Sequence, residues 1–177
     1  RKQEHNTTML VNVLSQIVEF RNGESGSHVR HIRLLTEKIM AQLLRKTDKY
    51  SLSSEEQDSI TLASALHDIG KIAVPDAILN KSSRLTDAES DVMRQHTLWG
   101  KKILAGLEFL PQADLGASYH HERYDGTGYP AGLMGEDLPR MVWIIAAADA
   151  LDAMSSNRCY RKCCDLDYIL SEFERGR

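Results

Sequence analysis

The sequence has few cysteines and no long apolar run, and both scarcities exclude classes of protein. Its three cysteines, Cys159, Cys163 and Cys164, cluster late in the chain without C-x-x-C spacing. An odd number of cysteines without that spacing favours a reducing compartment, so we expect a cytoplasmic protein with these residues at packing or surface positions. No apolar run is long enough to span a membrane, and no secretory leader opens the chain.

Basic residues are not in excess either, because the 177 residues carry a formal net charge of -3. The chain therefore lacks the basic field that duplex nucleic acid requires of its partners. A small anionic substrate would need locally placed cations instead. The length suits one domain that buries a core without disulfides. The first residue is Arg1 rather than Met, so we expect a piece of a longer protein.

No alternating strand pattern stands out, and helical spacing of apolar residues dominates the chain. We expect an all-α bundle of about seven or eight helices, with a connecting helix in residues 1–20 and the domain proper in 21–177. A Gly-rich loop is expected from residue 124 to 139. Two capping boxes, at residues 53–56 and 86–89, open helices. The expected helices lie near residues 4–20, 32–43, 53–68, 77–79, 86–96, 112–121 and 140–154.

Polar residues interrupt two strongly apolar helical segments. His67 and Asp68 follow the run at 62–66, and Asp149 lies within the run at 144–151. A buried carboxylate costs several kcal/mol unless it is paired or binds a metal. His67 alone fits a hydrogen-bonded core histidine equally well, and Asp149 alone fits a buried ion pair or a helix cap. Such interruptions often mark functional sites.

Further histidines make a metal site the stronger interpretation. Glu24 and His28 are four residues apart, so they would share one helix face. His96 and the pair His120 and His121 add three imidazoles. Histidine and carboxylate together suit manganese, iron or zinc. On a helix, His67 and Asp68 would point about 100° apart and supply two neighbouring ions. We expect His5 and His31 to be surface or interface residues.

Four motifs resemble the HD metal-dependent phosphohydrolase superfamily and, within it, the HD-GYP family. The likeness runs from about residue 13 to residue 168, nearly the whole chain, and the first two motifs together are highly specific. In order along the chain the four motifs are 66–72 (LHDIGKI), 120–130 (HHERYDGTGYP), 148–154 (ADALDAM) and 158–162 (RCYRK).

The resemblance implies an all-α phosphodiesterase that hydrolyses the bacterial second messenger cyclic di-GMP to linear pGpG and, in some members, onward to GMP. A hydroxide bridging two metals would attack the phosphorus. The resemblance also implies two or three divalent ions, iron or manganese. Six implied metal ligands are His67, Asp68, His96, His120, His121 and Asp149, and an additional ion would be held by Glu24 and His28.

The implied catalytic residues are Asp68, which would bridge the metals, and Lys71, which would reach the scissile phosphate. Arg158 and Arg161 match positions that bind the ligand's phosphates. Family architecture implies an upstream receiver or sensor domain joined to the first helix. The apolar stripe of that helix could instead be a homodimer contact, and both can hold.

The sequence departs from the family at Trp143, where many relatives have Arg, and at Cys159, where Pro is common. It also ends at Arg177, whereas the family usually continues with another helix, so we expect a domain truncated at its C-terminus. Two alternatives stay open. One is a phosphohydrolase acting on another nucleotide, and the other is a module that binds cyclic di-GMP without cutting it. We expect Gly126, Gly128 and Pro130 to shape the loop rather than to take part in the chemistry.

Overall fold

The computed structural model describes residues 2–22, 27–156 and 163–175, with side chains from residue 5 onward. Over these residues the chain is all-α, as predicted, and contains no strand. The elements are α1 (Lys2–Arg21), α2 (His28–Lys46), α3 (Ser54–Ser64), η1 (Ile69–Ala73, a 3-10 helix), α4 (Asp76–Leu79), α5 (Asp87–Arg94), α6 (His96–Leu104), α7 (Ala113–Tyr119), η2 (Gly135–Asp137, also 3-10), α8 (Arg140–Ser155) and α9 (Leu166–Glu174).

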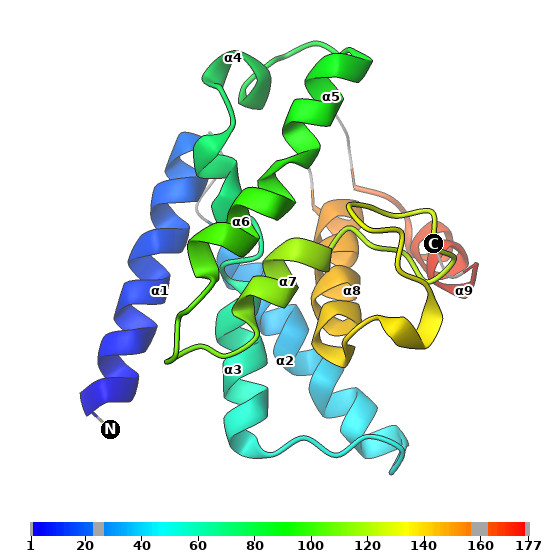
Figure 1. Ribbon diagram of the computed structural model, residues 1–177. Coiled ribbons are helices and arrows are strands. Elements are labelled where there is room, and N and C mark those ends of the chain that lie inside the picture. The colour runs from blue at the N-terminus through cyan, green and yellow to red at the C-terminus, as the bar shows by residue number, and fades with distance from the viewer. Residues whose placement is uncertain (1, 23–26, 157–162, 176–177) are drawn as a thin grey trace.

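The helices form a bundle with α1 and α9 at opposite sides, and α4 and α5 project from one end (Figure 1). The principal contacts pair α6 with α7, α2 with α8 and α2 with α3. Buried side chains such as Met40, Leu66 and Ile145 fill the space between these helices. None of the described helices has the length and apolarity needed to cross a membrane.

Both predicted capping boxes are confirmed. The Ser53 hydroxyl accepts a hydrogen bond from the Glu56 amide, and the Glu56 carboxylate accepts one from the Ser53 amide. Thr86 and Glu89 make the same exchange at the start of α5. Such reciprocal bonds satisfy amides that the first helical turn leaves without partners. They fix where α3 and α5 begin, and therefore where the segments carrying His67 and His96 lie.

Three helix ends differ from the prediction, and each difference falls at a candidate site residue. Helix α3 stops at Ser64, so His67 and Asp68 lie in a turn before η1 rather than on a continuous helix. The predicted helix over 86–96 ends at Arg94, and a new helix, α6, begins at His96. The helix predicted over 112–121 ends at Tyr119, so the tandem histidines follow it.

After α3 ends, η1 approaches α6 closely. A Cβ on Gly70 would lie 2.5 Å from the amide nitrogen of Gly100 and closer still to the His96 carbonyl oxygen. Only glycine permits this separation, because the neighbouring atoms are backbone. The turn thereby brings Asp68 next to the first residue of α6.

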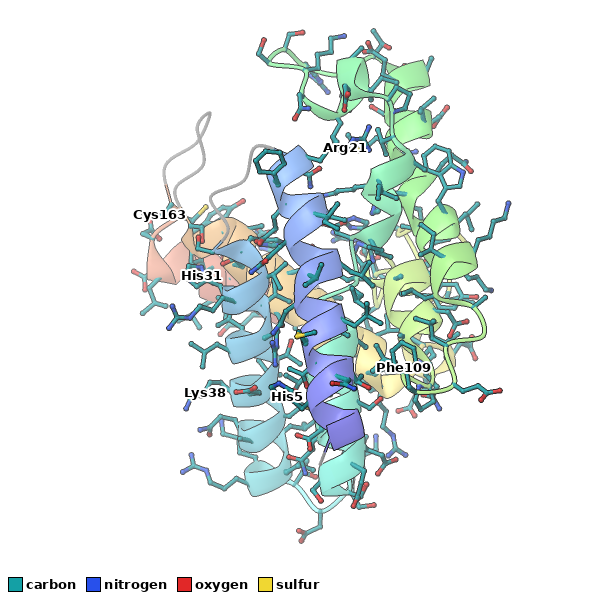
Figure 2. The ribbon with its side chains drawn as sticks, turned by 90° about the vertical axis from the view of Figure 1, so that its left-hand side faces the viewer. His5, Arg21, His31, Lys38, Phe109 and Cys163 are labelled. Carbon is teal, nitrogen blue, oxygen red and sulfur yellow. The ribbon has the colours of Figure 1, made fainter. Side chains whose placement is uncertain are left out.

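The end of α1 is bonded to two site-bearing segments. Arg21 donates hydrogen bonds to the carbonyl oxygens of Lys71, Ile72 and Val74, and it pairs with Asp76 at 2.9 Å (Figure 2). The buried Glu19 carboxylate accepts a bond of 2.7 Å from the Val29 amide, in the first turn of α2. The last turn of α1 therefore holds both η1 and the start of α2.

Candidate metal centre

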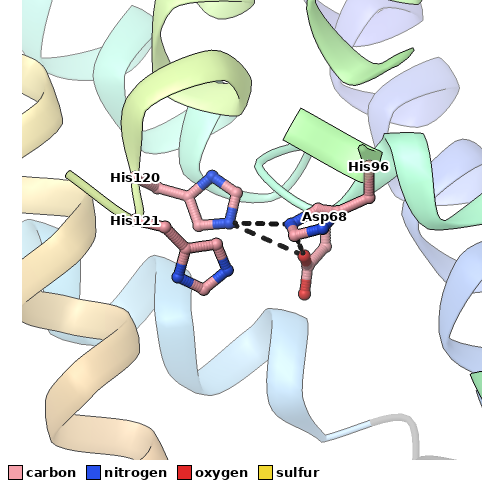
Figure 3. A group of neighbouring side chains, drawn as sticks. All are labelled: Asp68, His96, His120 and His121. Carbon is pink, nitrogen blue, oxygen red and sulfur yellow. Dashed lines mark hydrogen bonds and ion pairs between the residues drawn. The ribbon is translucent and has the colours of Figure 1, made fainter. Parts of the chain in front are cut away.

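Five predicted ligands converge although they come from three parts of the chain. His67 and Asp68 lie in the turn before η1, His96 begins α6, and His120 and His121 follow α7. Asp68 Oδ1 is 3.4 Å from His96 Nε2 and 3.7 Å from His120 Nε2, and Asp68 Oδ2 is 3.3 Å from His67 Nε2. Figure 3 shows Asp68, His96 and the two tandem histidines facing one another.

Two overlapping donor groups can be defined among the described residues. Asp68, His96, His120 and His121 each offer a ligand atom, and these atoms all lie within 4.8 Å of one another. Asp68 and His67 form the second group with His28 under the same limit. Because the Asp68 carboxylate belongs to both groups, its two oxygens can serve two neighbouring ions.

The backbone orients three of the imidazoles toward this centre. The Nδ1 atoms of His67, His96 and His120 lie 2.7, 2.7 and 3.1 Å from the carbonyl oxygens of Ser64, Met93 and Ala117, respectively. A carbonyl can only accept, so Nδ1 of each ring carries a proton, and Nε2 is the nitrogen that faces the centre. This is the arrangement that metal-binding histidines usually have.

Burial supports a metal at this position. His67 and His96 are each 1% exposed, and His120 is 3% exposed. Within the described part of the chain, His67 Nε2 and Asp68 Oδ1 are buried without a hydrogen-bond partner. Leaving such groups unsatisfied costs about 1–3 kcal/mol each, and more when one is charged. A divalent ion held by these donors would remove that cost, so the residues present fit the metal that the motifs imply.

The electrostatics keep most of the imidazoles ready to bind. Burial lowers the pKa of His96, and burial together with the neighbouring histidines holds the pKa of His120 well below its ordinary value. Burial also lowers the pKa of His121 to about 4. These three rings are therefore neutral at pH 7, which is the form that coordinates a metal.

His67 and Asp68 behave as a charged pair. Burial alone would lower the pKa of His67, but the charge of the Asp68 carboxylate 3.3 Å from its Nε2 raises it to about 9. Burial likewise opposes ionisation of Asp68, yet the charges of Lys71 and His67 hold its pKa well below the usual range. Lys71 Nζ lies 2.6 Å from Asp68 Oδ2, on the side of the turn that the three-residue spacing predicts.

Asp149 and His28 lie at the edge of the cluster. Asp149 Oδ1, on α8, is 3.9 Å from His67 Nε2, and its side chain is 21% exposed. His28 begins α2, and the centroid of its ring lies 5.6 Å from that of His67. The structure thus brings His28 into a donor group and leaves Asp149 somewhat farther away.

Asp152 is a site residue that the sequence analysis missed. It is 4% exposed, and its carboxylate lies 2.8 Å from His28 Nδ1 and 3.2 Å from His31 Nδ1. A signal was present, because Asp152 follows Asp149 by three residues and therefore shares its helix face. His31 was expected at the surface; it is half-exposed, but it also contacts this buried carboxylate.

Glu24, Arg158 and Arg161 lie outside the described residues. Their predicted roles at the additional ion and at the phosphates therefore remain predictions.

The loop that follows His121 folds back against it. The Tyr129 ring stacks on the His121 ring with centroids 4.7 Å apart, and the Arg94 guanidinium lies 5.3 Å from the Tyr129 centroid. A Cβ on Gly128 would lie 2.5 Å from the His121 carbonyl oxygen, so glycine is required there. The backbone of this loop therefore shapes the surroundings of His121.

Glu122, which the sequence analysis did not single out, anchors the same loop. This carboxylate is 5% exposed and accepts hydrogen bonds from the amides of Ala131, Gly132 and Leu133. Its position directly after the pair His120 and His121 was the sequence signal that could have identified it.

A cavity of about 520 Å³ adjoins the donor cluster. His120, His121 and Asp149 contribute to its wall, and most of the remaining lining is apolar or aromatic. The centre is therefore open to a ligand on the side of α8.

Comparisons with known proteins place the chain in a family. The family model described as HD domain matches residues 12–177. The chain is 38% identical over 168 residues to a cyclic di-GMP phosphodiesterase response regulator of Xanthomonas campestris, covering 93% of this chain and 43% of the relative. It is 40% identical over 154 residues to a 3'3'-cGAMP-specific phosphodiesterase of Vibrio cholerae, covering 86% and 28%. The chain thus spans less than half the length of these relatives.

A solved structure shares the fold. The crystal structure of a cyclic GMP-AMP specific phosphodiesterase of V. cholerae superposes with a TM-score of 0.66 at 16% sequence identity, covering 95% of this chain and 44% of the other.

Proposed function

The chain belongs to the HD domain family, and we propose that it hydrolyses cyclic di-GMP to the linear dinucleotide pGpG, with GMP as a further product. The observation that carries the proposal is the shared Asp68 carboxylate, which lies in both groups of metal donors. Such sharing is what a site for two neighbouring divalent ions requires. The 38% and 40% identical relatives named as cyclic dinucleotide phosphodiesterases support the substrate class.

We propose iron or manganese as the metal, because mixed histidine and carboxylate donors suit these ions. The described residues supply donors for two ions, and a third would depend on Glu24 together with His28. Bound divalent ions would acidify a water and neutralise charge on the phosphate. Asp149 would complete the set from the α8 side.

The protein's own residues then have separate tasks. Asp68 belongs to both donor groups and would help to hold both ions. Lys71 lies against Asp68 and, once substrate enters, its ammonium can donate to a non-bridging phosphate oxygen and stabilise the charge that grows there. Arg158 and Arg161 would hold the phosphates through paired donors.

We propose that residues 1–20 connect the domain proper, 21–177, to an upstream receiver or sensor domain, and that the protein is cytoplasmic. The printed name of the X. campestris relative, a response regulator, supports the first proposal. Leu10, Val13, Ile17 and Phe20 form an exposed apolar stripe on α1 with the 3-4-3 spacing of a coiled-coil seam. This stripe supports a homodimer contact as well.

A second candidate substrate is cyclic GMP-AMP, because one relative of 40% identity is named as specific for it. The two substrates share the phosphodiester chemistry and differ in one base. A direct competition between them therefore decides which of the two this site prefers.

The test is turnover by metal-loaded protein. Purified protein containing reduced iron or manganese is assayed for metal content and for loss of cyclic di-GMP and of cyclic GMP-AMP. We expect His67→Ala combined with Asp68→Ala, and Asp68→Asn alone, to lose metal and abolish turnover. His5→Ala is the matched control, since His5 is exposed on α1. Binding of cyclic di-GMP without turnover by the fully metallated protein would overturn the proposal.

A further inference from the structure

The cavity beside the donor cluster has two chemically different parts. His120, His121 and Asp149 form the part it shares with the metal donors. The rest is lined mostly by apolar side chains, including three aromatic residues, Tyr124, Trp143 and Phe173; Glu122 and Arg123 are its charged members. Its volume of about 520 Å³ falls within the range of roughly 300–1,000 Å³ that is usual for small-molecule sites.

The aromatic residues converge from three segments of the chain. Tyr124 follows α7, Trp143 lies on α8 and Phe173 lies on α9. The rings of Tyr124 and Trp143 have centroids 6.3 Å apart at an interplanar angle of 60°. Tyr124 is 60% exposed and Phe173 is 39% exposed, so their rings are accessible to a ligand. Flat aromatic surfaces of this kind are the usual stacking partners of nucleic-acid bases.

We propose that this cavity receives one purine base of the substrate and that Trp143 is the residue that stacks on it. The inference rests on the proposed function, because it assumes that the phosphodiester lies at the metal donors. The apolar and aromatic side chains of the lining desolvate a neutral base at little cost and offer a phosphate no donor. The Arg123 guanidinium, the cation of the lining, already faces a carboxylate, with its Nε 3.5 Å from Asp125 Oδ1. The Asp149 carboxylate in the same wall would also repel a phosphate.

Trp143 has space on a second side. It also lines a cavity of about 230 Å³ with Ile39, Leu43 and Ile144, between α2 and α8. An indole between two cavities can shift to meet a base without displacing the backbone of α8. Replacing it by a small residue would join the two spaces, so a side chain that fills the position is the better test variant.

The first experiment compares Trp143→Leu with Trp143→Phe in metal-loaded protein. Leucine is apolar and still fills the position, but it has no aromatic ring on which a base can stack. Phenylalanine keeps an aromatic ring. Base stacking contributes about 1–3 kcal/mol, so we expect Trp143→Leu to raise KM for cyclic di-GMP roughly 5- to 150-fold, with Trp143→Phe much closer to wild type. Turnover of methyl p-nitrophenyl phosphate, a phosphodiester without a purine, and metal content should stay unchanged.

The second experiment observes binding without catalysis. In a Trp99→Phe background, Trp143 is the remaining tryptophan, and GMP added to the metal-loaded protein should quench its emission by stacking. Inorganic phosphate, which has no base, should leave the tryptophan emission unchanged.

These measurements separate the two proposals. Hydrolysis of cyclic di-GMP with a KM that does not respond to Trp143→Leu would overturn the base site and leave the proposed function standing. Absence of hydrolysis with quenching by GMP would refute the function while the base site stands. Absence of both would overturn both.

Discussion

Replacing Gly70 by alanine tests the packing that places Asp68 beside His96. A Cβ at this position would lie 2.5 Å from the Gly100 amide nitrogen and closer to the His96 carbonyl oxygen. Ordinary contact begins near 3.4 Å, so η1 and α6 must separate by about 1 Å or more. Neither neighbouring atom belongs to a side chain that can rotate away.

The expected change in the free energy of unfolding follows from two opposing effects. Alanine restricts the unfolded chain and would by itself stabilise the fold by about 0.4–1 kcal/mol. Overpacking in a well-packed contact costs about 1–3 kcal/mol, and a clash against backbone belongs at the upper end. We therefore expect Gly70→Ala to lower the free energy of unfolding by about 2–3 kcal/mol, which corresponds to a melting temperature lower by about 4–12 °C for a chain of this size.

Urea denaturation of metal-free protein is the appropriate assay, because bound metal would otherwise add its own stabilisation. Gly116→Ala is the matched control. The nearest side-chain atom to a Cβ there is Ile145 Cδ1 at 3.0 Å, the flexible end of a side chain, and alanine is the better helix former by about 1 kcal/mol. We expect this control to remain within about 1 kcal/mol of wild type.

Metal content provides the second readout for Gly70→Ala. Separation of η1 from α6 would widen the 3.4 Å distance between Asp68 Oδ1 and His96 Nε2, so the variant should hold less metal. A Gly70→Ala protein as stable as Gly116→Ala, and with full metal content, would refute the close packing of η1 on α6.

Two further predictions concern Asp152 and Glu89. Asp152→Asn should weaken metal binding about 10- to 100-fold, because a carboxylate behind a ligating ring such as His28 fixes its orientation; an unchanged titration with Mn²⁺ would contradict this. The Lys81 ammonium, and then the Thr86 amide, lower the pKa of Glu89 to about 2, so its stabilising contribution is present above the unfolded value of 4.5 and is lost as pH falls through about 2. Urea unfolding at pH 5 and pH 2.5 should therefore show a smaller acid-induced loss in Glu89→Gln than in wild type, and equal losses would exclude this origin.

The sequence predicted the helical class and most helix starts, since these depend on local signals. The capping boxes at Ser53 and Thr86 fix two helix beginnings through bonds within four residues. The end of α3 was not predictable in the same way. The turn and η1 that follow α3 pack against α6 at Gly70, a contact between segments that the chain brings together only on folding.

The candidate site likewise contains residues that local sequence signals predict and residues that depend on tertiary contacts. His67, Asp68 and His96 were predicted because they interrupt apolar patterns or match motifs, and the structure brings them together. Asp152 was missed because its role depends on α2 lying across α8, so that His28 reaches its carboxylate. Local pattern therefore identified the candidate ligands that belong to motifs, while Asp152, which contacts one of them, required the tertiary fold.

Hydrogen bonds at the last turn of α1 couple the orientation of that helix to the candidate site. Arg21 donates a hydrogen bond to the Lys71 carbonyl oxygen in η1, and Glu19 accepts one from the first turn of α2, next to His28. Turning α1 by one residue position, about 100°, would carry both side chains off their partners. A rotation of α1 therefore acts on the segments of Lys71 and of His28 together.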